Sequence, residues 1–376
     1  MNTTRIIVSA LLLCCSSMGA FAQTENLPKQ IKVGHERMKV RKEIKMPEID
    51  GYQLLKCDFH IHTIFSDGIV WPTLRVQEAW EEGLDAIAIT EHIEGQPARP
   101  GIMKGDHNRS FDYAKEEALR KNIILIKGGE ITRSMPPGHL NALFINDVNA
   151  LDQKDYMKAI EEACKQGAFI QWNHPGWGVN EIKWHDVHEK LYQKGWLHGI
   201  EVFNEFEWYP VALNWVNEKN LTLLCNTDIH DVNERLYDFS ETDHRPMTLV
   251  LAKERTQEAI KEALFAKRTL IYFYNTLMGK EEYLEKFFNA SIEVSPVYYE
   301  SETKKYLSIK NNSDVPFELV NINNTKGYPD KIVIPGGKSV SIVISNSSSQ
   351  NGVDYEVANA IISPTKKLNV NLFKSL

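Results

Sequence analysis

The stretch that decides the fold reads His60-Ile61-His62-Thr63-Ile64-Phe65-Ser66-Asp67-Gly68, and it follows the apolar run at residues 54–59. This run predicts a buried strand, and side chains two apart on a strand leave the same face. We therefore expect His60 and His62 to point together at the strand end, with Asp67 in the turn that follows. Two neutral imidazoles and a carboxylate are typical of a metal site, although a lone His-x-His pair also occurs on solvated strands.

Histidine and acidic residues recur where other apolar runs begin or end. Because the carboxyl ends of parallel strands form one rim in α/β folds, we expect these side chains to converge there. Their number exceeds what one zinc needs, which predicts two or three bridged divalent metals rather than a coincidental set of polar strand ends. The residues are Glu91-His92 after 86–90, Glu130 after 123–129, His139 before 140–145, His174 after 168–173, and Asp228-Ile229-His230 after 221–227.

Taken in chain order, these motifs resemble the metal motifs of the PHP (polymerase and histidinol phosphatase) superfamily over residues 54–273. The motifs are His60-x-His62-Thr63, Ser66-Asp67-Gly68, Thr90-Glu91-His92, Gly129-Glu130, Gly138-His139, Asn173-His174-Pro175 and Asp228-Ile229-His230. The resemblance implies a distorted seven-stranded β/α barrel, (β/α)7, with a trinuclear metal centre. Two departures are visible: some relatives carry His at the position of Asp67, and Thr-Glu-His replaces the commoner Thr-Asp-His at 90–92.

The resemblance also implies which residues hold each metal. His60, His62, Glu130 and Asp228 would hold the first metal, Glu130, His139 and His174 the second, and Asp67, His92 and His230 the third. We expect Glu130, Asp228 and His92 to be the catalytic residues among them. Imidazole favours zinc, iron or manganese over magnesium, while the carboxylates also suit manganese, so the identity of the metal stays open.

The resemblance implies a phosphoesterase acting on a small phosphorylated substrate, and this ligand set suits that chemistry. A water that bridges two cations loses its proton near neutral pH and attacks as hydroxide, while the cations neutralise the phosphate oxygens. Hydrolysis of an amide or lactone is the runner-up, because such a nucleophile also attacks carbonyls. A third interpretation is a carbohydrate- or surface-binding protein in which the barrel is only a scaffold.

Several residues outside the ligand set have two interpretations. Arg133, Arg235 and Arg245 follow predicted barrel strands and are expected to bind the substrate phosphate. Asp58 either orients an imidazole or caps the strand end.

Aromatic and histidine residues in the loops are similarly open. Trp71 and Trp177 either line the pocket or pack in the core. The remaining histidines of the stretch between two strands, His185, His188 and His198, are interpreted as surface residues.

The chain begins with the pattern of a Sec-type signal peptide. Residues 1–22 contain Arg5, an apolar run and Ala20-Phe21-Ala22, which predicts cleavage after Ala22 and a secreted, periplasmic protein. The apolar run is too short to be a transmembrane segment. Residues 23–51 are polar and predict an extended lead-in. The three cysteines beyond the signal, Cys57, Cys164 and Cys225, imply no disulfide framework.

Two structural domains are expected after the lead-in. The barrel is predicted over residues 52–288, with helices at 72–82, 110–121, 153–166, 208–219 and 256–266. Residues 289–376 predict a small all-β sandwich, with strands at 306–310, 317–322, 331–334, 339–344 and 368–372. The sandwich contains no histidine. Its role is not readable from the sequence.

Length and composition predict a soluble two-domain protein. The 376 residues are 43% hydrophobic, which is enough for a barrel core, and the formal net charge is −7. A net negative charge disfavours bulk binding of nucleic acid, itself a polyanion. The oligomeric state is not predicted.

Overall fold

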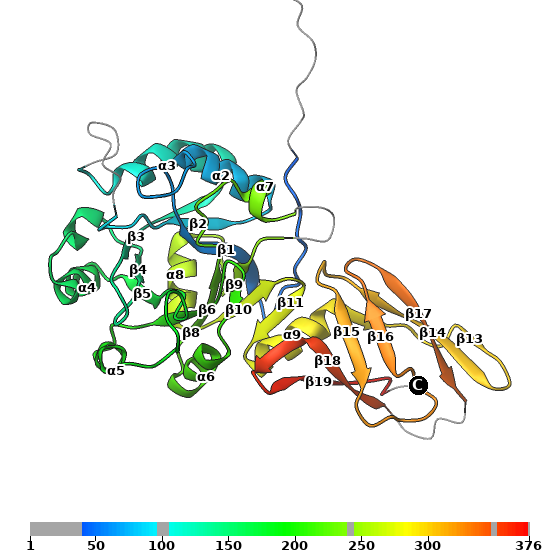
Figure 1. The fold of residues 1–376 in the computed structure, drawn as a ribbon. Helices are drawn as coiled ribbons and strands as arrows, with labels where there is room; N and C mark the ends of the chain where they lie inside the picture. The colour runs from blue at the N-terminus through cyan, green and yellow to red at the C-terminus, as the bar shows by residue number, and fades with distance from the viewer. Residues whose placement is uncertain (1–39, 96–104, 239–243, 347–351, 375–376) are drawn as a thin grey trace, which may run out of the picture. The chain divides into compact units, whose positions relative to one another are not determined.

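The computed structural model describes residues 40–95, 105–238, 244–346 and 352–374 (Figure 1). The predicted signal peptide at 1–22 and the lead-in up to residue 39 lie outside the described residues. A mixed sheet orders its barrel strands β10-β9-β1-β2-β3-β4-β5-β6, and both β7 and β8 pair with β6. These strands are β1 (Gln53–Ile61), β2 (Ala86–Ile89), β3 (Ile124–Ile131), β4 (Leu140–Leu143), β5 (Phe169–Trp172), β6 (Gly199–Asn204), β7 (Glu207–Trp208), β8 (Thr222–Asn226), β9 (Met247–Ala252) and β10 (Thr269–Phe273).

The directions of the strands bring their ends to one rim. Parallel pairing joins β1 to β2, β2 to β3, β5 to β6 and β6 to β8. Strand β4 runs antiparallel to both β3 and β5, so it begins at the rim where the parallel strands end. A residue just before β4 therefore reaches the same rim as residues just after the parallel strands.

Side chains close the barrel where the ladder is interrupted. The Thr248 hydroxyl on β9 accepts from the Cys225 N–H and donates to the Cys225 carbonyl on β8, both at 2.9 Å. At the rim, the Asp228 N–H donates to the His60 carbonyl at 2.9 Å. The end of β1 and the turn after β8 are thereby held together, and the barrel is distorted, as the resemblance implied.

Helices cover the barrel at α2 (Pro72–Glu81), α3 (Arg109–Lys121), α4 (Tyr156–Lys165), α5 (Asp186–Gln193), α6 (Pro210–Lys219), α7 (Asn233–Leu236) and α8 (Gln257–Phe265), with a 3-10 turn, η2 (Val148–Leu151). The five predicted helices are confirmed. Helix α4 begins later than predicted because the Asp155 carboxylate accepts the Met157 N–H at 2.9 Å and caps it there. No helix within the described ranges is long and apolar enough to cross a membrane.

Apolar side chains fill the barrel at the end opposite the rim. Phe59, Phe169 and Leu264 belong to one buried cluster, and α8 contacts β3, β5 and β9. Helix α8 therefore covers this end, and the polar residues described below gather at the rim.

The C-terminal region is all-β, as predicted, and forms two sheets. One contains β12 (Ile292–Val294), β13 (Tyr299–Glu300), β14 (Lys304–Asn311) and β17 (Ser339–Ser345). The other contains β15 (Phe317–Asn321), β16 (Lys331–Ile334), β18 (Val353–Ser363) and β19 (Lys366–Leu372). Strand β18 was not predicted, because a bulge between Val357 and Ile361 interrupts its alternation.

Helix α9 (Glu281–Ser291) connects the barrel to this region, so the predicted boundary at 288/289 falls inside a helix. Phe288 of α9 packs against Phe317 of β15, with ring centroids 5.0 Å apart. Strand β11 (Thr276–Gly279), antiparallel to β10, also pairs in parallel with β18. The barrel sheet thus continues into the C-terminal region, and the residue at which the two domains divide stays a prediction.

Candidate metal centre

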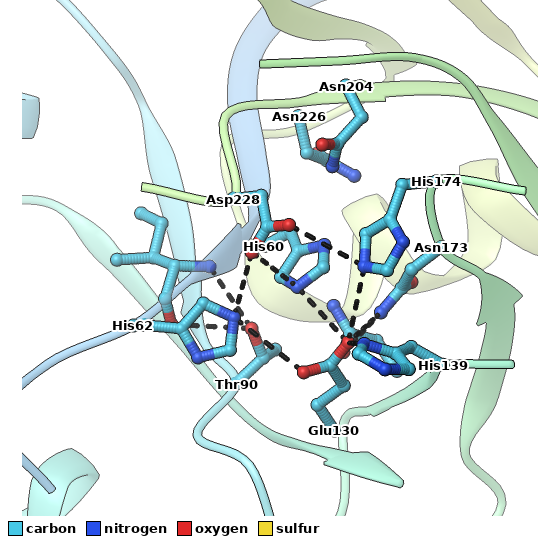
Figure 2. A network of polar contacts seen from close by, with 12 residues as sticks. His60, His62, Thr90, Glu130, His139, Asn173, His174, Asn204, Asn226 and Asp228 are labelled. Atoms are coloured by element: carbon cyan, nitrogen blue, oxygen red, sulfur yellow. Dashed lines mark hydrogen bonds and ion pairs between the residues drawn. The ribbon is translucent and has the colours of Figure 1, made fainter. Parts of the chain in front are cut away.

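Glu130, near the end of β3, lies at the centre of a cluster of imidazoles (Figure 2). Its side chain is fully buried. The imidazoles come from the ends of β1, β2 and β5 and from the start of β4, so the strand directions bring together residues far apart in the sequence. Its carboxylate faces His139 at 2.9 Å, His60 and His174 at 3.6 Å, His62 at 3.7 Å, and His92 in direct contact.

Asp228 is a second point where predicted ligands meet. Its Oδ1 lies 3.1 Å from His60 Nε2 and 2.9 Å from His62 Nε2, and its Oδ2 lies 3.5 Å from His174 Nε2. Asp228 has a φ of 53°, in the left-handed region that residues with a Cβ rarely adopt. Such strain occurs often at functional sites, where the surrounding structure holds the residue in place.

Asp67, His92 and His230 form the outer edge of the cluster. The Asp67 Oδ1 lies 3.3 Å from His92 Nε2 and 3.0 Å from His230 Nε2. The Asp67 side chain is 55% exposed, whereas His62, whose ring stacks on both histidines at 4.3 Å, is buried. This edge is therefore the part of the cluster nearest to solvent.

The cluster contains ligand atoms that a cation would satisfy. His60 Nε2, His62 Nε2, His139 Nδ1 and Asp228 Oδ1 are buried and make no hydrogen bond to any described residue. Buried polar atoms normally make hydrogen bonds, so ring nitrogens that face carboxylates at ion-pair distance without a hydrogen bond fit a metal site. Within 4.8 Å of one another lie ligand atoms of His62, Asp67, His92 and His230; of His60, His62 and Asp228; of His60, Glu130 and His174; and of His92, Glu130 and His139. All nine predicted ligands thus converge, and their division among three metals stays a prediction.

The electrostatics of the cluster favour bound positive charge. Burial opposes the ionisation of Asp228, but the imidazoles of His60 and His62 hold its pKa well below its usual range. Burial also acts to lower the pKa of His60, yet the carboxylates of Asp228 and Glu201 outweigh it and raise that pKa to about 10. The pKa of His62 falls to about 3 through burial and the neighbouring His92. Carboxylates that draw protons onto buried imidazoles also favour divalent cations, which replace those protons on binding.

Comparison with solved structures identifies the family of this chain. A solved structure from Bacteroides vulgatus, a two-domain protein containing a predicted PHP-like metal-dependent phosphoesterase, shares 44% identity with a TM-score of 0.84, and the alignment covers 90% of this chain and 99% of that chain. The chain belongs to the PHP-like metal-dependent phosphoesterases. The family and the clustered ligands together support binding of divalent metals.

Other matches are partial. The DUF5001 family model, described as an Ig-like domain, matches residues 292–373, which agrees with the two C-terminal sheets. An uncharacterized protein of Methanocaldococcus jannaschii is 28% identical over 49% of this chain and 85% of its own length. An amidohydrolase from Chromobacterium violaceum is 15% identical over 48% of this chain and 89% of that chain, with a TM-score of 0.37 that is too low to bear on function.

A further buried carboxylate, Glu201 on β6, holds residues of the PHP-like metal centre in position. It accepts the Nδ1–H of His60 at 2.9 Å, the backbone N–H of His174 at 2.9 Å, and the amides of Asn204 and Asn226, each at 2.8 Å. With Nδ1 donating to Glu201, Nε2 of His60 is the nitrogen left for a metal. Sequence reasoning missed Glu201, although one acidic residue inside the apolar strand at 199–204 was a usable signal.

Arg245 does not lie where a substrate-binding residue must lie. Its side chain is 1% exposed, donates to Asp58 at 3.0 Å and contacts Glu82. Asp58 also accepts the Thr227 hydroxyl at 2.6 Å, directly before the ligand Asp228. Arg245 is therefore a structural partner of two buried carboxylates. Asp58 caps the turn after β8, whereas the imidazole of His60 is oriented by Glu201.

The other two predicted arginines have carboxylate partners of their own. Arg133, just beyond β3, lines a cavity of about 460 Å³ beside the metal centre and pairs with Glu94. Arg235 on α7 is 65% exposed and pairs with Asp231 at 3.1 Å. Substrate binding by either arginine stays a prediction.

The structure decides the open interpretation of Trp177 and overturns that of His188. Trp177 is 62% exposed and lines the same cavity, with its ring 5.3 Å from that of His139, so it is not a core residue. The prediction that His188 lies at the surface is wrong: it is fully buried, and its ring stacks on Trp172 at 3.7 Å. Trp71 is 38% exposed and packs beside Phe65.

Proposed function

We propose that the protein is an exported, metal-dependent phosphoesterase that hydrolyses an ester of a small phosphorylated substrate. The observation that carries this proposal is the convergence at one rim of nine histidine and carboxylate side chains, Glu130 and Asp228 among them, with buried ring nitrogens that make no hydrogen bond to a described residue. Membership of the PHP-like metal-dependent phosphoesterases supports it. Export rests on the signal-peptide pattern at residues 1–22, which lie outside the described residues.

The chain's own residues prepare the site for this chemistry. Two or three divalent cations, zinc, manganese or iron, would activate the attacking water and neutralise the charge that builds on the phosphoryl oxygens. Glu130 and Asp228 each face several imidazoles, and Glu130, which belongs to two of the predicted ligand sets, would be shared between cations. His92, which contacts Glu130 and lies 3.3 Å from Asp67, connects the inner and outer parts of the cluster.

Supporting residues hold these ligands before any substrate binds. The Asn173 amide donates to Glu130 Oε1 at 3.0 Å, which fixes the carboxylate between the imidazoles (Figure 2). Glu201 holds His60, and Asp58 with Arg245 holds the turn that carries Asp228. Ligands fixed in this way do not reorganise when charge develops in the transition state.

A panel of esters tests the proposal. Protein loaded with zinc, manganese or iron is given 4-nitrophenyl phosphate, bis(4-nitrophenyl) phosphate and 4-nitrophenyl acetate. We expect hydrolysis of at least one phosphate ester and its loss on adding a chelator. Hydrolysis of the acetate alone would favour an amide or lactone hydrolase. No turnover of any ester with any metal would contradict an enzymatic function.

A further inference from the structure

The cavity beside the metal centre is lined mainly by uncharged side chains. Its volume is about 460 Å³, and Met135, Val179 and Trp177 lie on its wall beside the ligands His139 and His174. A group bonded to a phosphate at the centre would therefore extend into this cavity. The volume is sufficient for a ring, which has a larger cross-section than a short alkyl chain.

The positive charge of Arg133, which lines the cavity, is neutralised by a carboxylate of the protein. Of the described residues that line the cavity, Arg133 is the one Lys or Arg, and its guanidinium pairs with Glu94. Arg133 also donates to the carbonyls of Thr132 at 2.8 Å and Gln153 at 3.0 Å. Glu94 is itself held by the Thr132 N–H at 2.8 Å. A second anionic group on the leaving group would find the one cationic side chain of the described lining already paired with Glu94.

Trp177 offers an open aromatic face next to the reacting position. It is 62% exposed, and its ring lies 5.3 Å from that of His139 and 5.7 Å from that of His174. The indole face is thus accessible to a flat group that enters beside the ligands, and such groups stack on tryptophan.

We propose that this cavity binds the leaving group of the ester, and that this group is an uncharged ring stacked on Trp177. The proposal rests on the phosphoesterase function and names its substrate class: the phosphate ester of an uncharged phenol or cyclic alcohol. A second phosphate or a carboxylate on the leaving group would gain no ion pair from Arg133, because Glu94 already occupies that guanidinium.

Binding of phosphonates to the metal-loaded protein tests the stacking without needing turnover. Calorimetry compares phenylphosphonate with methylphosphonate for the wild type, Trp177→Ala and Trp177→Phe. The control is Trp208→Ala, a 38% exposed tryptophan on β7 outside the cavity. We expect Trp177→Ala to lower the affinity for phenylphosphonate by about tenfold and the affinity for methylphosphonate by less than about twofold. Trp177→Phe should lower the affinity for phenylphosphonate by an intermediate factor, and the control should leave both affinities unchanged. Equal weakening of both ligands, or of neither, would overturn the stacking.

Removing the charge of Glu94, the partner of Arg133, tests the proposed preference for an uncharged leaving group. In Glu94→Gln the amide oxygen still accepts the Thr132 N–H, but Arg133 loses its ionic partner. We expect 4-carboxyphenyl phosphate to gain at least about fivefold in kcat/KM relative to phenyl phosphate. The matched control, Glu262→Gln, releases Arg268 on another face and should leave this ratio unchanged. A wild type that already prefers the carboxylated ester would overturn the proposal.

The two experiments separate this proposal from the phosphoesterase function. If the wild type hydrolyses no phosphate ester but binds phenylphosphonate through Trp177, the ring site stands and the assigned reaction is wrong. If it hydrolyses phosphate esters with no dependence on Trp177 or Glu94, the reaction stands and the ring site is wrong.

Discussion

Two regions of the barrel contain buried histidines, and their surroundings differ. At the rim, the Nε2 atoms of His60 and His62 point toward the carboxylates of Glu130 and Asp228. Neither Nε2 atom makes a hydrogen bond to a described residue. On α5, the Nε2–H of His188 instead donates to the Pro137 carbonyl at 2.7 Å. Burial alone therefore does not distinguish a ligand from a packing residue.

The difference lies in what each ring nitrogen faces. Carboxylates around His60 raise its pKa to about 10, whereas burial and a single carbonyl leave the pKa of His188 at about 4. His62 has a low pKa of about 3 as well, yet its Nε2 faces Asp228 at 2.9 Å, so the group that a ring nitrogen faces, and not the pKa, distinguishes a ligand from a packing residue. The predictions below test this distinction, beginning with the largest expected effect.

Removing the charge of Glu130 should have the largest effect, because its carboxylate faces five imidazoles at the rim. We expect Glu130→Gln to reduce turnover of a phosphate ester by several orders of magnitude, since a shared metal ligand is lost. Circular dichroism should show an intact fold. Turnover near that of the wild type at saturating metal would show that the cluster is not the active site.

Glu201→Gln should have an intermediate effect, because Glu201 positions His60 without reaching the metals. The amide cannot accept all the hydrogen bonds that the carboxylate accepts, so His60 loses its fixed orientation. We expect metal affinity to fall by about 10- to 100-fold, measured by competition with a chromogenic chelator. The matched control is Glu189→Gln on α5, which loses an ion pair with Lys219 far from the rim. An unchanged metal affinity in Glu201→Gln would contradict the role of Glu201 in positioning His60.

Substitution of His188 should have the smallest effect, and it should change the free energy of unfolding without changing metal binding. Its folded pKa of about 4 lies below the unfolded value of about 6.5, so its contribution to stability is complete above the unfolded value and is lost as the pH falls toward 4. We expect this residue to account for about 2 kcal/mol of the loss in unfolding free energy between pH 7 and pH 5. Urea unfolding of His188→Asn should show a correspondingly smaller loss over that range. The same pH dependence in the variant and the wild type would contradict the assigned pKa.

Sequence reasoning succeeded where the chemistry depends on strand ends. The motif order placed His60, Glu130, His174 and Asp228 at one rim, because the direction of a strand fixes where its last residue lies. His139 reached the same rim from the start of a strand, since β4 runs antiparallel to its neighbours.

It was less successful where a role depends on contacts between distant segments. Arg245 and Glu82 are 163 positions apart, and only the closed barrel brings them together. Glu201 and His188 likewise acquire their roles from the partners of individual atoms. The periodicity of apolar residues in a sequence does not predict whether a buried polar side chain faces a carboxylate or a backbone carbonyl.

Metal content tests the central claim most directly. The protein is purified without chelator, reconstituted with zinc or manganese, desalted and subjected to elemental analysis. Its rim variant His60→Ala/His62→Ala and the control His188→Asn are treated in the same way. We predict more than one metal per wild-type chain, a clear loss in the rim variant and no change in the control. A wild type that holds no metal even after reconstitution would contradict the account.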